Sequence, residues 1–128
     1  MLTAPEIRIR GFVDDIDTEL KDADVFLCVN NATDYNVGHT RYLHAWSLGC
    51  SVVAAEAVRE AMPELVHREN AILGRDAKGI AAAVVEAAQS PELRRDLGQN
   101  GYETFKRYFV APVVAREIVH RLQGAGRA

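Results

Sequence analysis

The stretch TRYLHAWSLGCSVVAA, residues 40–55, places a helical pattern directly before a pattern of a buried strand. Leu43 and Trp46 are spaced as on one face of a helix, and Gly49 follows where a C-terminal cap is expected. Residues 51–55 then form an uninterrupted run of small and apolar side chains. Such a run is typical of a parallel strand covered on both faces. We therefore expect helices on both sides of a parallel sheet.

Three other segments have the composition of strands. Apolar residues and arginines alternate in residues 7–13, and Asp14 follows directly after them. Residues 25–29 and 71–73 are continuous apolar runs. Helical patterns lie between these segments. The alternation predicts an α/β fold with a parallel sheet of about four strands, right-handed crossovers, and helices on both faces.

Helix starts are marked by residues that cap or open helices. Asp17 and Thr18 lie at the expected start of one helix, and Asp76 is expected to cap another that extends to Gln89. Ser90 with Pro91 opens a further helix. Pro112 opens the last one, whose apolar residues are four positions apart: Val114, Ile118 and Leu122. We expect these C-terminal helices to pack back on the sheet, one domain over residues 1–122, and a frayed tail over residues 123–128.

Length and composition limit the class of protein. The 128 residues are 48% hydrophobic and 26% charged, which suffices for one buried core. The formal net charge of -3 provides no general attraction for nucleic acid, so no nucleic-acid partner is expected. Charges occur throughout the first twenty residues, and no uncharged stretch is long enough to span a membrane. A cytoplasmic location is predicted, with peripheral membrane contact left open. Cys28 and Cys50 are interpreted as buried core thiols.

The eleven residues 30–40 form a long polar loop between a predicted strand and a predicted helix. In parallel α/β sheets the ligand crevice lies at the carboxyl ends of the strands, and loops of this length are commonly functional. Gly38 permits close approach of the backbone, and Thr40 can cap the helix. Arg41 is unfavourable at a helix start unless something offsets its charge. Either a bound phosphate does so, or Arg41 pairs with Asp34 or points to water.

The histidines and acids give no pattern of a metal site. His44 follows Arg41 by three residues and shares a helical face with it, yet it is equally interpretable as a hydrogen-bonded structural residue. His39, His67 and His120 lack ligand spacing, and the Asp15-Ile16-Asp17 sequence is better explained as a helix cap than as a metal-binding pair. Phosphate loops and the dinucleotide fingerprint are absent from the sequence. No metal and no cofactor are predicted.

The order of several short stretches resembles the retaining, two-domain group 1 glycosyltransferases, whose two facing domains are Rossmann-like. The resemblance implies a C-terminal, donor-binding domain that lacks its first two strands. It also implies a nucleotide-sugar as the donor substrate, and a sugar or lipid-linked acceptor held by a missing N-terminal domain. The isolated chain is then expected to be inactive. The resembling stretches are residues 9–15 (IRGFVDD), 23–27 (ADVFL), 44–55 (HAWSLGCSVVAA), 63–66 (PELV), 69–73 (ENAIL) and 90–109.

The same resemblance implies the site residues. In the family, two glutamates separated by seven residues contact the sugar and the ribose, and backbone amides between them hold the diphosphate. These positions correspond to Asn36 and His44, so neither carboxylate is present here. No catalytic residue is assigned. The implied donor or diphosphate contacts are Asn36, Gly38, His39, Thr40 and Arg41, and the implied ribose or sugar contacts are His44 and Glu64.

Two other functions stay open. Loss of both glutamates also suits a non-catalytic binding or assembly module that kept the fold. An unrelated small-ligand domain of flavodoxin-like topology is the third interpretation. If two strands are missing, the strand over residues 7–13 must pair beside residues 25–29 or with another chain, which predicts a possible homodimer through an exposed sheet edge.

Overall fold

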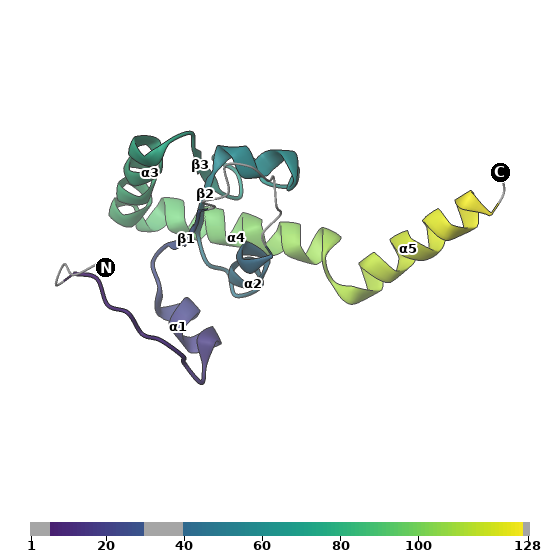
Figure 1. Cartoon of the computed structure of the whole chain (residues 1–128), viewed down its shortest axis with the longest axis horizontal. Coiled ribbons are helices and arrows are strands. Elements are labelled where there is room, and N and C mark those ends of the chain that lie inside the picture. Colours follow the sequence, from purple (N-terminus) through teal and green to yellow (C-terminus); the bar gives the residue numbers. More distant parts are fainter. Residues whose placement is uncertain (1–5, 30–39, 127–128) are drawn as a thin grey trace.

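Strand β2 (Val52–Ala55) is the middle of the sheet in the computed structural model, which describes residues 6–29 and 40–126. β1 (Phe26–Cys28) and β3 (Ile72–Gly74) pair with it in parallel on either side, so the sheet of the described residues has the order β1-β2-β3 (Figure 1). This confirms the parallel, Rossmann-like α/β fold, with one strand fewer than predicted.

Helices cover both faces of the sheet. Val52 and Ala54 of β2 belong to one buried cluster, and Val53 belongs to the other, because alternate residues of a strand point to opposite faces. α2 (Arg41–Ser47) and the short helix η1 (Glu56–Glu60) contribute to the first cluster. α3 (Ala77–Gln89) and the first half of α4 contribute to the second.

Helix α4 (Pro91–Tyr108) spans both layers and contacts both α2 and α3 (Figure 1). Two buried glycines allow this. A Cβ atom at Gly98 would overlap the carbonyl oxygen of Gly49, and one at Gly101 would overlap the ring of Trp46. Gly49 has a φ of 74° at the end of α2, as its predicted capping role requires. The α2–α4 contact therefore depends on positions without side chains.

The predicted capping residues are confirmed at three helices. Asp15 accepts a hydrogen bond from the Thr18 amide at the start of α1 (Ile16–Asp22). Asp76 caps α3 and Ser90 caps α4 in the same way, each through the amide three residues later. These side chains satisfy amides that the helices leave unpaired.

The strand expected over residues 7–13 does not form. Ile9 and Phe12 are 75% and 92% exposed, and Arg10 forms an ion pair with Glu19 of α1 instead. A strand needs a neighbour that supplies backbone hydrogen bonds and an apolar surface, and no other described segment pairs with these residues. The alternating pattern was therefore not enough to specify a strand.

Helix α5 (Ala111–Ala125) extends away from the rest of the chain (Figure 1). Its predicted apolar face is only partly covered: Val114, Ile118 and Leu122 are 38%, 54% and 67% exposed. The prediction that the C-terminal helices pack back on the sheet thus holds for α4 and not for α5. Regular helix also continues to Ala125, three residues into the expected tail. Within residues 6–29 and 40–126, no helix has both the length and the apolar character needed to cross a membrane.

The close approach of α4 predicts opposite results for one substitution at two helical glycines. Gly98→Ala should lower the free energy of unfolding by about 1–3 kcal/mol, because the new methyl group overlaps the backbone at Gly49. Gly124→Ala on α5 meets no atom within 4 Å and should leave stability unchanged or raise it by up to about 1 kcal/mol. Urea unfolding followed by circular dichroism measures both. Equal effects of the two substitutions would contradict this account.

Candidate functional site

The three parallel strands end at one edge of the sheet, at Cys28, Ala55 and Gly74. Helix α2 connects β1 to β2 and begins at this same edge, so Thr40 and Arg41 lie where a ligand is expected in such sheets. Three further predicted contacts, Asn36, Gly38 and His39, lie outside the described residues.

Arg41 is an exposed cation in the first turn of α2. Among the described residues, no carboxylate forms an ion pair with it. Burial raises the pKa of the nearby Cys28 thiol, and the charge of Arg41 offsets part of that rise. The positive charge therefore acts at the end of β1. The alternative pairing of Arg41 with Asp34 involves a residue outside the described ones.

Thr40 occupies the residue before α2, but its side chain accepts no hydrogen bond from the helix. The prediction that Thr40 caps α2 through its hydroxyl is therefore wrong. Its backbone is already in the helical region, with φ -87° and ψ -9°, and an N-cap normally has an extended backbone that turns its side chain toward the following amides.

His44 pairs with helix α1. Its Nε2 atom lies 2.6 Å from Oδ1 of Asp17, and both side chains are about half exposed. The structural interpretation of His44, as a hydrogen-bonded residue, is thus supported. The pairing also places a carboxylate from α1 beside His44, the position at which the resemblance implies a glutamate in the family.

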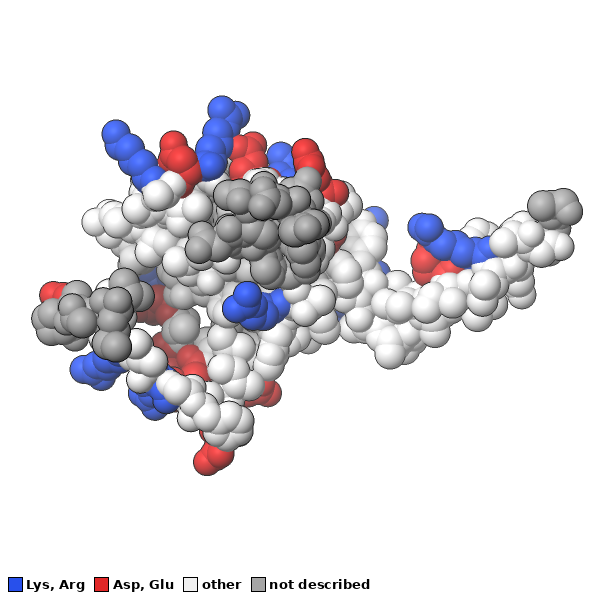
Figure 2. Space-filling model, in the orientation of Figure 1, with Lys and Arg blue, Asp and Glu red and all other residues white. Residues whose placement is uncertain are grey.

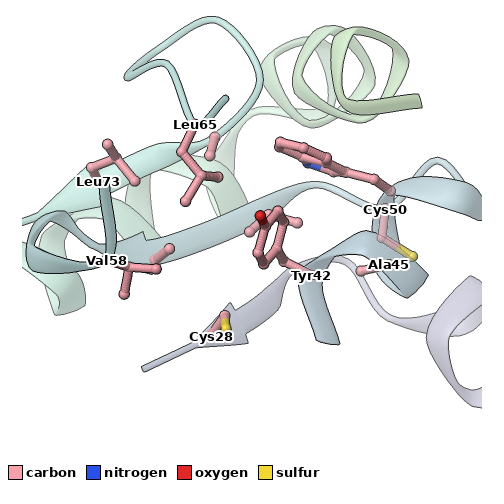
Figure 3. Packing of buried hydrophobic residues seen from close by; sticks show 11 residues of the cluster. Cys28, Tyr42, Ala45, Cys50, Val58, Leu65 and Leu73 are labelled. Carbon is pink, nitrogen blue, oxygen red and sulfur yellow. The ribbon is translucent and has the colours of Figure 1, made fainter. Parts of the chain in front are cut away.

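Glu64 accepts a hydrogen bond from the hydroxyl of Tyr42, which is fully buried on α2. Burial, and then the hydrogen bond to Glu64, raise the pKa of Tyr42 above its usual value, so the hydroxyl stays protonated and can donate. Figure 3 shows the Tyr42 ring in the core, with Leu65 from the Glu64 segment among its neighbours. Tyr42 was not identified from the sequence, although a tyrosine at a buried helical position requires a partner for its hydroxyl.

Asn70 fixes the segment that carries Glu64. Its Oδ1 accepts from the amide of Val66 at 2.9 Å, and its Nδ2 donates to the carbonyl of Glu64 at 2.8 Å. Nδ2 also donates to Thr104 of α4, and the Asn70 carbonyl accepts from the Trp46 indole at 3.1 Å. Because the Asn70 side chain is buried and uses both ends of its amide, the segment is attached to α2 and α4 at once.

A groove of about 960 Å³ opens beside Glu64, between residues 63–70 and the C-terminal half of α4. It does not include Arg41. The groove is lined by Pro63, Glu64, Val66, Glu69, Asn70, Asn100, Glu103, Thr104, Lys106, Arg107, Tyr108 and Phe109. The candidate residues therefore fall into two places, the sheet edge at Arg41 and the groove at Glu64, and the Tyr42 side chain connects them.

Charges of both signs are mixed on the visible surface. Figure 2 shows acidic and basic side chains next to one another over the upper face. Attraction for an anion then has to come from individual groups such as Arg41. Within the described ranges, no three His, Cys, Asp or Glu side chains are grouped to hold a metal ion.

Comparison of the sequence with models of known protein families identifies one family. A family model described as "Glycosyl transferases group 1" matches residues 2–90, more than half of the chain. The matched region contains the whole sheet, Arg41, His44 and Glu64, whereas α4 and α5 lie beyond it. No curated protein matches the chain.

The Asn70 contacts predict that this residue stabilises the groove segment. Asn70→Ala should lower the free energy of unfolding by about 1–3 kcal/mol, because it leaves the Val66 amide and the Glu64 carbonyl without partners. Asn100→Ala removes an exposed side chain with one hydrogen bond, to Glu69, and should cost less than about 0.5 kcal/mol. Urea unfolding compares the two variants, and similar losses would contradict the role of Asn70.

Proposed function

Since this chain belongs to the group 1 glycosyl transferases, we propose that it is the donor-binding part of such an enzyme and takes a nucleotide-diphosphate sugar at the carboxyl edge of its sheet. One observation carries this proposal: Arg41 is an exposed cation, without an ion-pair partner in the described part of the chain, at the edge where three parallel strands end. That edge is the usual ligand position in open α/β sheets.

The chemistry of glycosyl transfer explains why a cation is needed there. When the bond to the sugar breaks, negative charge develops on the departing nucleotide diphosphate, and positioned positive charge stabilises it. A guanidinium can donate two parallel hydrogen bonds to phosphate oxygens. We assign the diphosphate to Arg41 and Thr40, with Gly38 and His39 before them and Asn36 as the sugar contact. The acceptor is assigned to another domain, so the chain alone is expected not to catalyse transfer.

A non-catalytic binding or assembly module is the second candidate. It is favoured by the residues at the two glutamate positions of the family, Asn36 and His44, and by the hydrogen bond that already engages His44 with Asp17. Activity of the complete enzyme separates the candidates. An Asn36→Ala, His44→Ala double variant should lose transfer if these residues contact the donor, whereas a binding module has no transfer to lose.

Isothermal titration of the chain with UDP, GDP and ADP tests the donor site. We expect at least one of them to bind, and Arg41→Gln to weaken that binding about tenfold or more, as expected for loss of a charge-assisted hydrogen bond. Arg95→Gln is the matched control. Arg95 is also exposed but lies at the opposite edge of the sheet, in a hollow shared with Asp24 and Ser51, which precede β1 and β2. No binding by any of the three, or equal weakening by both substitutions, would reject the proposal.

A further inference from the structure

The groove beside Glu64 has the size and the fixed walls of a ligand site. Its volume of about 960 Å³ is near the upper end of the range for ligand pockets, about 300–1,000 Å³. One wall is the segment over residues 63–70, which Asn70 attaches to two helices, and the other is helix α4. Hydrogen bonds within the chain therefore hold the first wall against α2 and α4.

The charged groups of the groove do not favour an anion. Glu64, Glu69 and Glu103 contribute three carboxylates. The two cations are already engaged: Lys106 lies 3.4 Å from Glu103, and Arg107 lies 5.2 Å from the ring centre of Tyr108. A phosphate would therefore meet more negative than free positive charge.

Glu64 presents one carboxylate oxygen for further bonding. Oε1 accepts from Tyr42, and the described residues place no hydrogen-bond donor on Oε2. The backbone of Glu64 is held as well, because its carbonyl accepts from Asn70. The side chain thus borders the groove in a fixed position, and it is an acceptor that suits hydroxyl donors.

Aromatic surface completes the groove. Tyr108 is 49% exposed, and the neighbouring Phe109 ring packs edge-on against it at 6.4 Å. A ligand that combines many hydroxyl donors with an apolar face, and that carries no negative charge, fits such surroundings. Carbohydrates have these properties.

We propose that the groove between residues 63–70 and the C-terminal half of α4 is a carbohydrate-binding site, separate from the donor site at Arg41. Glu64 accepts hydrogen bonds from sugar hydroxyls, and Tyr42 is a positioning residue that acts through Glu64. This inference deepens the proposed function and rests on it for the class of ligand, because the group that such an enzyme transfers is a carbohydrate. The groove would hold a sugar in addition to the acceptor that is assigned to another domain.

Titration of the ¹⁵N-labelled chain with maltose, cellobiose and lactose, followed by NMR, tests the site. At least one sugar should shift the amides of Val66, Asn100 and Thr104 in a saturable way. Glu64→Gln should weaken that binding about tenfold or more, because it removes the charge from the hydrogen bond. Glu92→Gln, an exposed acid in the first turn of α4, should leave the affinity unchanged.

A double-mutant cycle tests the role of Tyr42. Tyr42→Phe keeps the ring in the core and should weaken sugar binding about threefold to tenfold, as for loss of one hydrogen bond. In a Glu64→Ala background the same substitution should have no further effect on affinity, because Tyr42 acts only through Glu64. A merely structural Tyr42 would weaken binding in both backgrounds. Tyr102→Phe, an exposed tyrosine on α4, is the control.

The carbohydrate site would be overturned if none of the three sugars caused a saturable shift, or if Glu64→Gln bound sugar as well as the unchanged chain. It would also be overturned if UDP, or the basic peptide tetralysine, shifted the groove amides and the sugars did not. UDP shifts confined to the start of α2, without any sugar binding, would reject the carbohydrate site and leave the donor site standing. Sugar shifts in the groove without nucleotide binding would support the carbohydrate site and reject the donor site.

Discussion

The fold and the candidate site both depend on the close approach of α4 to the end of α2. Gly98 and Gly101 leave room for the Gly49 backbone and the Trp46 ring, which a single methyl group at either position would displace. With the ring in this place, the Trp46 indole donates to the carbonyl of Asn70. Asn70 in turn holds the backbone that presents Glu64. The position of the Glu64 carboxylate therefore depends on two positions of α4, Gly98 and Gly101, that carry no side chain.

Features that depend only on residues close together in the sequence could be predicted from the sequence. Asp76 and Ser90 cap helices through amides three residues away, and Gly49 ends α2, so each needs only its local sequence. The segment over residues 7–13 needed a partner strand, which no local pattern can provide, and it remains exposed. The sequence correctly predicted that the apolar residues of α5 lie on one side of the helix, but periodicity does not specify what covers that side.

The same distinction applies to the site. The place of Arg41 at the sheet edge follows from the order of strand, loop and helix, and Glu64 was identified through the family resemblance. Tyr42 and Asn70 were missed because their contacts join residues far apart: 22 positions separate Tyr42 from Glu64, and 34 separate Asn70 from Thr104. His44 was expected beside Arg41, and its pairing with Asp17 of α1 is also a long-range contact.

Helix α2 illustrates why these long-range contacts matter for a donor site. Seven residues form too short a helix to be stable alone in water, so tertiary contacts must hold it. Tyr42 and Trp46 fix one side of α2 in the core, with their polar atoms bonded to Glu64 and Asn70, and His44 fixes another side to α1. Arg41 directly precedes Tyr42 in the chain, so the core fixes the backbone position from which the Arg41 side chain extends. Under the proposed function, the diphosphate therefore meets a cation whose backbone position is set by buried residues of α2 and by the segment that lines the groove.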